Sequence, residues 1–230
     1  MIVYFAGVNT NPWCEAFVGL PVLESFADIT RLMDRHRPRF SSMCLDSGAY
    51  SVMTTGVSIS LREYISFAKQ HGQFYDFVAS LDSITGGVTE NLTNWKAMRE
   101  AGIDAMPTFH SGEDLDLLKA YCRISRRVGL GMKRPTGKMP PSSEVRAFLA
   151  QCFAVIPPDV KVHGWGMTNY TDLPFWSVDS TTWLWEMRAL MATTGQGADA
   201  LGCLTPRELV EIVQKKYLRF SKRQRWEGIL

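Results

Sequence analysis

Short apolar runs recur along the chain, and polar segments with helix-start signals separate them. Most of these runs lack the alternation of apolar and polar residues that marks a half-exposed strand, which is typical of strands buried on both faces. The runs predict strands at residues 2–7, 42–46, 74–81, 104–108, 128–132, 160–165 and 175–179, with a weaker eighth candidate at 200–204.

The segments between these runs predict helices with recognisable first turns. Ser60 and Glu63 form a capping box before one helix, and Ser111 opens another. Thr205, followed by proline and then glutamate at the third helical position, opens the last predicted helix. Regular alternation of strands and helices is the signature of parallel βαβ units.

Seven or eight such units favour a closed barrel over an open sheet. The chain has 230 residues, of which 46% are hydrophobic, enough for one sizeable core. We therefore expect an α/β fold with a single domain over residues 1–230, a somewhat degenerate (β/α)8 or TIM barrel. A basic C-terminal helix and tail would occupy about 205–230.

Three aspartates follow apolar runs and precede a turn or helix: Asp46, Asp82 and Asp179. The carboxyl ends of parallel barrel strands meet at one face, where such folds keep their chemistry. Each aspartate alone is equally readable as a turn-forming or helix-capping residue. Three carboxylates on one face would raise one another's pKa and divide into an acid and a nucleophile, the equipment for cleaving a glycosidic bond through a covalent intermediate.

Aromatic and imidazole side chains follow the same strand ends. Tyr50 and Phe109 are placed to stack on a flat base, and His110 and His163 are placed to bind a base edge or a phosphate. Core aromatics and structural histidines are the alternative interpretation of these four residues. Small residues that would allow a planar ligand close to the backbone are Gly131, Gly164 and Gly166.

Charge and cysteine usage narrow the class of protein. The net charge is +2, and the five cysteines are scattered without a C-x-x-C pair, so we expect neither a disulfide framework nor a metal site. No apolar stretch approaches the roughly 20 residues of a membrane span, and the N-terminus reads as a strand. A cytoplasmic protein that does not contact membranes is therefore expected.

Basic residues gather in clusters that could follow a phosphate backbone, although solvated helix faces explain such clusters as well. Neutralising the C-terminal cluster should weaken nucleic-acid binding if the first interpretation holds. The candidates for backbone contact are Lys133, Arg134, Lys215, Lys216, Arg219, Lys222 and Arg223.

Two segments carry a family resemblance. The segment Asp-Ser-Gly-Ala-Tyr-Ser that begins at Asp46 resembles the Asp-Ser-Gly-Gly-Phe-Gln segment of tRNA-guanine transglycosylases. Ser-Val-Asp-Ser-Thr-Thr-Trp around Asp179 is similar to the strand end that carries the nucleophile of phage and bacterial DNA 7-deazaguanine transglycosylases, which are relatives of the tRNA enzymes. Intermediate blocks fall in the same order, so the resemblance spans about residues 2–183.

The resemblance implies a role for each matching residue. Asp179 would attack C1′ of a guanosine and expel guanine, and Asp46 would act as general acid and base. Asp82 would hydrogen-bond the base edge. The base pocket would be formed by Ser47, Gly48, Tyr50, Phe109, His110, Gly131, His163, Gly164 and Gly166. A 7-deazaguanine of the preQ0 or preQ1 type would then attack the intermediate, with retained configuration and without a cofactor.

Departures from the family pattern bear on the substrate. The tRNA enzymes carry a C-terminal zinc site of cysteines and a histidine, whereas this chain has only Cys203 in that region and is shorter. Both features favour DNA as the partner, with tRNA as the alternative. Ala49 replaces a glycine and Ser51 a glutamine of the motif. A non-catalytic nucleic-acid-binding barrel and an enzyme acting on free nucleosides remain open, as does a homodimer or an accessory protein.

Overall fold

The computed structural model describes residues 1–8, 11–28, 33–56, 58–83, 87–133, 139–184, 207, 208 and 211. The side chain of Tyr50 is not among them. The expected strand at 200–204, the expected C-terminal helix apart from three of its residues, and the basic residues Arg134, Lys215, Lys216, Arg219, Lys222 and Arg223 lie outside the described residues.

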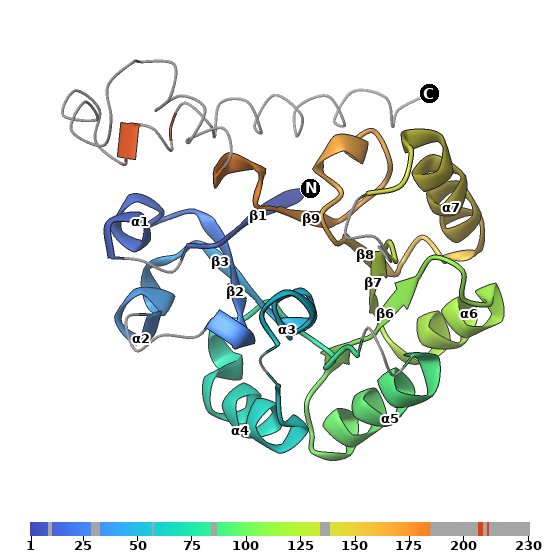
Figure 1. Cartoon of the computed structure of the whole chain (residues 1–230), viewed down its shortest axis with the longest axis horizontal. Coiled ribbons are helices and arrows are strands. Elements are labelled where there is room, and N and C mark those ends of the chain that lie inside the picture. Colours follow the sequence, from blue (N-terminus) through green and yellow to red (C-terminus); the bar gives the residue numbers. More distant parts are fainter. Residues whose placement is uncertain are drawn as a thin grey trace.

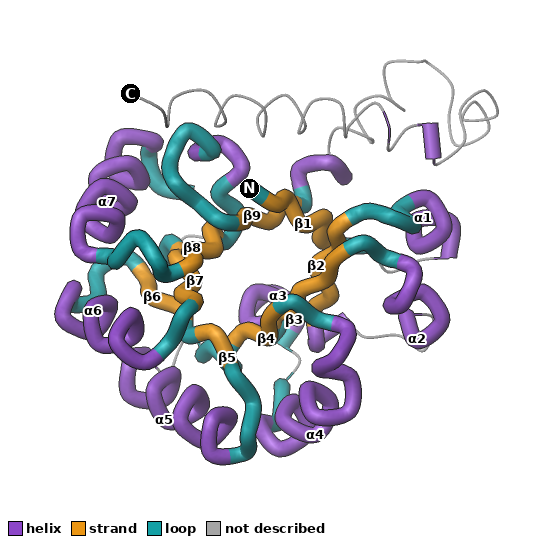
Figure 2. Tube along the Cα trace, turned by 180° about the vertical axis from the view of Figure 1, so that it is seen from behind, coloured by secondary structure: helices purple, strands orange, loops and turns teal. Residues whose placement is uncertain are grey.

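Parallel strands form a single sheet in the order β5-β4-β3-β2-β1-β9-β8-β7-β6. The strands are β1 (Ile2–Ala6), β2 (Pro21–Ser25), β3 (Ser42–Asp46), β4 (Phe77–Ala79), β5 (Ala105–Met106), β6 (Thr108–His110), β7 (Arg127–Gly131), β8 (Lys161–Gly164) and β9 (Ser177–Ser180). β5 and β6 stand at the two ends of this order, yet only Pro107 separates them along the chain. The sheet therefore closes on itself as an eight-stranded barrel, seen as a ring in Figure 2.

Pro107 explains why one strand of the barrel is divided into two. Proline has no backbone N–H and interrupts a ladder of hydrogen bonds. Its carbonyl still accepts a hydrogen bond from the N–H of Gly129 at 2.8 Å, which keeps the chain in contact with β7. β5 pairs with β4 and β6 pairs with β7, so the two halves together complete the barrel wall.

Helices surround the ring of strands. They are α1 (Asn11–Ala16), α2 (Met33–His36), α3 (Ala49–Thr55), α4 (Leu61–His71), α5 (Gly87–Glu100), α6 (Leu115–Ile124) and α7 (Ser142–Val155). Six of them lie outside the ring, whereas α3, which no sequence pattern predicted, lies over its opening (Figure 1). Single 3-10 turns are η1 (Phe26–Asp28), η2 (Arg37–Arg39), η3 (Gly72–Phe74) and η4 (Thr168–Tyr170), of which η4 stands where a helix would link β8 to β9. The predicted degenerate TIM barrel is confirmed.

β2 is a strand that the sequence analysis did not predict. It pairs with both β1 and β3, so that Ser25 lies beside Asp46. A proline at its start and a glutamate inside it hid the strand, although proline is tolerated as the first residue of a strand. The Glu24 carboxylate is buried but neutralised, because it accepts hydrogen bonds from Arg37 Nε at 2.8 Å and from the Tyr75 hydroxyl at 2.6 Å. With β2, eight strands are complete by residue 180, without the candidate at 200–204.

Two helix starts show how local chemistry sets boundaries. The Ser60 hydroxyl accepts from the N–H of Glu63 at 3.4 Å, which confirms the predicted cap of α4. α6 begins later than expected, because Asp114 rather than Ser111 is its N-cap and accepts from the N–H of Asp116 at 2.9 Å. The residues between Ser111 and Asp114 remain at the end of the barrel wall.

The core has two layers. The larger one fills the space between strands and helices, and the smaller one fills the barrel interior. Buried members of the interior layer are Tyr4, Ala6, Leu23, Cys44, Phe77 and Met106. Because side chains fill the barrel from within, space for a ligand remains only at its ends.

Four of the five cysteines lie in the described part of the chain. Cys14, Cys44, Cys122 and Cys152 are free thiols, and Cys203 lies outside the described residues. Within the described ranges, no helix is long and apolar enough to cross a membrane.

Candidate active site

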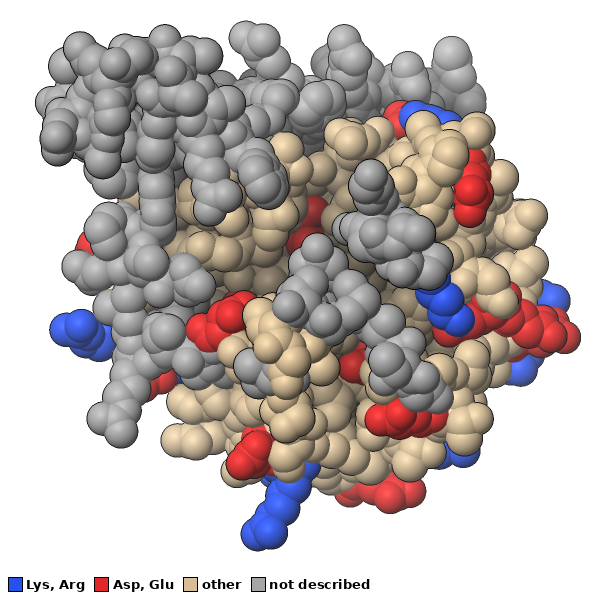
Figure 3. Space-filling view, in the orientation of Figure 1, with Lys and Arg blue, Asp and Glu red and all other residues tan. Residues whose placement is uncertain are grey.

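A cavity of about 560 Å³ opens at the C-terminal ends of the strands. Asp46, Asp82 and Asp179 all line it, so the three predicted carboxylates do converge. Figure 3 shows acidic side chains at the centre of this face. A volume of this size fits the range of about 300–1,000 Å³ typical of small-molecule sites.

Asp46, the last residue of β3, has a strongly raised pKa. Burial and the neighbouring Asp179 raise its pKa to about 7; the charge of Asp82 adds to this, and the backbone N–H groups of Gly48 and Ser47 oppose it. The N–H of Gly48 lies 3.1 Å from Oδ2. A carboxyl with a pKa near neutrality can both give and take a proton during a reaction cycle.

Gly48 supports this carboxyl without lining the cavity. Its φ of +85° is a conformation that favours glycine, and a Cβ there would lie 2.6 Å from Cβ of Ala27. Its expected place in the base pocket is therefore corrected to a turn position beneath Asp46.

Asp179 lies inside β9 and is held by a neighbouring loop. Its Oδ1 accepts a hydrogen bond from the N–H of Gly166 at 2.7 Å, and Nε2 of His163 lies 3.5 Å from the same oxygen. The side chain is 14% exposed, so it reaches the cavity without being fully solvated. Among the described residues, Oδ2 has no hydrogen-bond partner. Asp179 thus presents one fixed and one free oxygen.

His163 does not lie on the rim, where it was expected to bind a base or a phosphate. Its side chain is completely buried in the barrel interior, beside Asp179. Nδ1 lies 2.8 Å from Oγ of Ser177, and the ring meets that of Trp165 edge-on at 4.3 Å. The expectation is corrected because Trp165, not His163, lines the cavity.

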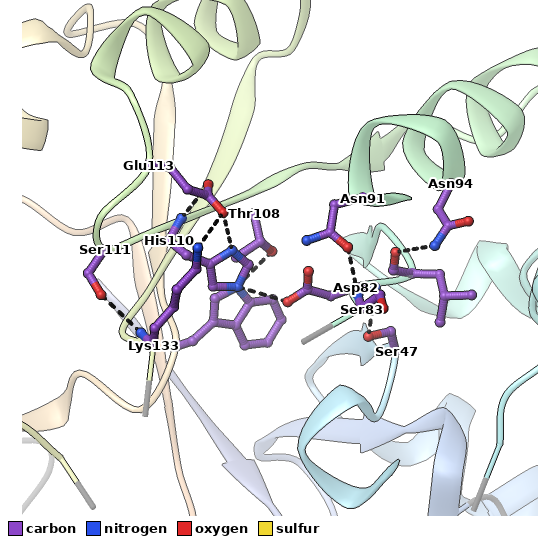
Figure 4. Close-up of polar contacts among 12 residues, drawn as sticks. Ser47, Asp82, Ser83, Asn91, Asn94, Thr108, His110, Ser111, Glu113 and Lys133 are labelled. Carbon is purple, nitrogen blue, oxygen red and sulfur yellow. Dashed lines mark hydrogen bonds and ion pairs between the residues drawn. The ribbon is translucent and has the colours of Figure 1, made fainter. Parts of the chain in front are cut away.

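Asp82 and His110 form an ion pair across the cavity wall (Figure 4). Nε2 of His110 lies 2.8 Å from Oδ2 of Asp82, and Nδ1 lies 3.3 Å from Oε1 of Glu113. Burial would lower the pKa of His110, but the two carboxylates outweigh it and raise the pKa to about 9. Both ring nitrogens of the imidazolium therefore face protein carboxylates and leave no acceptor for a base.

Glu113 is a site residue that the sequence analysis missed. Burial alone would raise its pKa, but hydrogen bonds from the ring and backbone of His110 and the charge of Lys133 hold the pKa below its usual range. Nζ of Lys133 lies 3.4 Å from Oε1 of Glu113. In sequence, Glu113 looked only like part of a helix start; its position three residues after His110 was the available signal.

The loop that carries Asp82 is held in place by side chains (Figure 4). The N–H of Asp82 donates to Oγ of Ser47 at 3.4 Å, and the N–H of Ser83 donates to Oδ1 of Asn91 at 2.6 Å. Nδ2 of Asn94 donates to the carbonyl of Leu81 at 3.2 Å. Ser47, predicted to contact a base, lines the cavity and also fixes this loop.

Two further candidates lie outside the cavity. Phe109 is buried and stacks on Phe148 of α7, with ring centroids 6.1 Å apart and planes inclined by 12°. Gly164 is a packing glycine, because a Cβ there would lie 2.7 Å from Phe175 and 2.8 Å from Met167. Both positions are corrected from the base pocket to the core between barrel and helices.

The Gly-x-Gly pair in β7 makes room for side chains. A Cβ at Gly129 would lie 2.5 Å from Nε1 of Trp165, and one at Gly131 would lie 3.2 Å from the ring of His110. Nε1 of Trp165 donates to Oγ1 of Thr108 at 3.1 Å. Of the predicted pocket glycines, Gly131 and Gly166 line the cavity.

Hydroxyl groups make up much of the remaining wall. A hydroxyl can both donate and accept a hydrogen bond, so this wall suits a polar ligand. The hydroxyl residues that line the cavity are Ser25, Ser47, Ser51, Ser80, Ser83, Thr108, Thr168, Ser180, Thr181 and Thr182.

Comparison with known proteins identifies the fold. No family model and no curated protein matches the chain. Among solved structures, two variants of the tryptophan synthase alpha-subunit from the hyperthermophile Pyrococcus furiosus are similar, with TM-scores of 0.53 and 0.55. Each is 13% identical to this chain, and each match covers 94% of this chain and 95% of the other. At this level of identity the similarity shows the shared barrel fold alone.

Proposed function

We propose that the protein is a base-exchange transglycosylase that replaces guanine in DNA with a 7-deazaguanine. The observation that carries the proposal is the pair of carboxyls on one cavity: Asp46, with a pKa raised to about 7, and Asp179, with one oxygen held and the other free. Unequal surroundings divide two carboxyls into an acid and a nucleophile. The family resemblance of the segments around both residues supports the same assignment.

In the first step, Oδ2 of Asp179 attacks C1′ of the target nucleoside, and the electrons of the C1′–N9 bond leave with guanine. Protonated Asp46 gives its proton to the departing base. In the second step, Asp46 as carboxylate takes a proton from the incoming 7-deazaguanine, whose nitrogen attacks C1′ and releases Asp179. Two inversions at C1′ give retained configuration.

Asp82 fits recognition of a guanine-like edge. A carboxylate only accepts hydrogen bonds, and guanine offers adjacent N–H donors at N1 and its 2-amino group. Asp82 lines the cavity, and its Oδ2 lies 2.8 Å from Nε2 of His110. Adenine lacks the N1–H and 2-amino donors and would form fewer hydrogen bonds with Asp82, which disfavours its binding.

The nucleic acid must present its base outside the stack, because C1′ and the base edge are shielded in a duplex. Similarity of the Asp179 segment to the DNA enzymes supports DNA as the substrate, and tRNA is the alternative. Lys133, 48% exposed at the cavity, is the candidate for phosphate contact within the described residues.

A base-exchange assay tests this proposal. Purified protein is incubated with guanine-labelled duplex DNA, and separately with labelled tRNA and labelled deoxyguanosine, each with a 7-deazaguanine. We expect label release from DNA that is abolished in Asp179→Ala. Release only from tRNA would transfer the proposal to the tRNA reaction, and release only from deoxyguanosine would make the protein a nucleoside-processing enzyme. No release from any substrate would contradict the proposed activity.

A further inference from the structure

We propose that His163 is a positioning residue for the nucleophile: its Nε2–H donates to Oδ1 of Asp179 and directs Oδ2 toward the substrate. This inference rests on the proposed role of Asp179. No sequence pattern pointed to it, because the contact depends on the register of two strands.

Strand register brings the three participating side chains together. β8 and β9 pair in parallel with His163 opposite Ser177, and Asp179 follows two residues later in β9. Alternate residues of a strand face the same side of a sheet, so Ser177 and Asp179 both point into the barrel. Ser177 and His163 are completely buried, whereas Asp179 reaches the cavity.

The contact with Ser177 determines which ring nitrogen carries the proton. Oγ of Ser177 lies 2.8 Å from Nδ1, and a hydroxyl that donates to Nδ1 leaves the ring proton on Nε2. Nε2 lies 3.5 Å from Oδ1 of Asp179 and has no shorter polar partner among the described residues. A buried N–H without a partner is unfavourable, so Asp179 is the acceptor that this arrangement provides.

A distance of 3.5 Å is longer than an ordinary hydrogen bond. Catalytic contacts in ligand-free enzymes are often long and shorten when the substrate binds. The imidazole ring itself is fixed by its neighbours, with ring centroids 4.3 Å from Trp165 and 5.0 Å from Phe77. The ring therefore offers a fixed donor position beside Oδ1 of Asp179.

The arrangement serves both chemical steps. Two donors, the N–H of Gly166 and Nε2–H of His163, converge on Oδ1, so Oδ2 is the oxygen free to form the bond to C1′. Once that ester exists, Oδ1 is its carbonyl oxygen, and the same donors stabilise the negative charge that returns to the carboxylate when the second base displaces it. His163 transfers no proton in this scheme.

Activity of matched variants tests the role. His163→Leu removes the donor, and His163→Gln keeps an N–H donor of similar reach. We expect His163→Leu to lower kcat about 10²-fold, as loss of one preorganised donor does elsewhere, with KM for the nucleic acid little changed. His163→Gln should have a kcat at least about tenfold above that of His163→Leu, because it restores the donor. Equal kcat for wild type and His163→Leu, or no recovery in a folded His163→Gln protein, would overturn the proposal.

A second measurement does not depend on activity. The chain has four histidines, so their side-chain ¹⁵N resonances can be assigned by substitution. We expect His163 to carry a proton on Nε2 and none on Nδ1, to shift its Nε2 resonance in Asp179→Ala, and to populate both tautomers in Ser177→Ala. A proton on Nδ1, or an Nε2 resonance that does not shift in Asp179→Ala, would overturn the proposal. If the spectra show the contact but no substrate exchanges its base, the proposed function fails and the His163–Asp179 pairing stands.

Discussion

Each of the three aspartates has a different partner, and this difference supports the proposed roles. Asp46 is buried near a second carboxylate and keeps its proton up to a pH of about 7. Asp82 contacts the His110 imidazolium, and Asp179 accepts a backbone N–H beside a buried histidine. In the proposed reaction, these different surroundings suit the three side chains to the roles of acid, acceptor and nucleophile.

The raised pKa of Asp46 predicts a pH dependence for base exchange. The acid must be protonated to expel guanine, so kcat/KM should fall as the pH rises above about 7. Asp46→Asn should lower kcat/KM about 10²- to 10⁴-fold and abolish this limb. The measurement is kcat/KM between pH 5 and 9, with the surface variant Asp116→Asn as the control that keeps the profile. A limb near pH 7 that persists in Asp46→Asn would assign it to another group.

The ion pairs of His110 predict a pH dependence of stability. The pKa of His110 rises from 6.5 to about 9 on folding, so its stabilisation is complete below pH 6.5 and disappears as the pH rises through about 9. The free energy of unfolding should therefore fall by up to about 3 kcal/mol across this window. Urea unfolding at several pH values should show this fall in wild type and in His71→Gln, but not in His110→Gln. An equal fall in His110→Gln would exclude the ion pairs as its cause.

Strands and helices of this chain differ in how well the sequence indicates them. Apolar runs identify a buried strand when nothing interrupts them, as in β3, whose bounds at 42–46 were predicted. β2 was not predicted, because the hydrogen bonds that Arg37 and Tyr75 donate to its buried Glu24 come from other parts of the chain. A stretch of sequence that contains Glu24 alone gives no sign of these partners.

The same limit applies to the candidate site. Asp46, Asp82 and Asp179 could be predicted because strand ends meet at one face of a barrel. The side of the barrel wall that a residue faces could not be predicted. Phe109 and His163 both stand near strand ends, yet Phe109 packs against α7 and His163 lies inside the barrel. A shift of one residue in register exchanges the two sides, and the sequence alone does not give the register.

Gly129 allows a prediction about strand β7. A Cβ there would lie 2.5 Å from Nε1 of Trp165, so Gly129→Ala must displace the indole from its hydrogen bond with Thr108. Overpacking of this kind destabilises by about 1–3 kcal/mol. Chemical unfolding monitored by tryptophan fluorescence measures the change, with Gly72→Ala as control, because a Cβ at Gly72 meets nothing within 4 Å. A Gly129→Ala protein as stable as wild type would show that the indole can move freely.

At the scale of the whole molecule, the two ends of the barrel have different chemistry. The C-terminal end carries the cavity with its carboxylates and hydroxyls. The other end is closed by structural contacts, among them the Tyr4 hydroxyl, which donates to Asp76 at 2.7 Å. One surface cation near that end, Arg126, is paired with Asp159. A nucleic acid that reaches the proposed active site would meet a concentration of negative charge at the cavity.

That charge makes a prediction about nucleic-acid binding. Carboxylates in the cavity repel phosphates, so affinity must come from cations elsewhere in the protein, and the basic cluster at 215–223 is the richest source in the sequence. Replacing Lys215, Lys216, Arg219, Lys222 and Arg223 by alanine should weaken DNA binding and reduce the slope of log K against log salt concentration by about 0.9 for each phosphate that the cluster no longer neutralises. Fluorescence anisotropy over a salt series measures the affinity and the slope.

A control variant neutralises Arg123 and Arg126, which lie at the end of the barrel opposite the cavity. It should change neither the affinity nor the slope. An unchanged slope in the five-residue variant would mean that the cluster neutralises no phosphate, and would leave Lys133 and Arg134 as the cations to test.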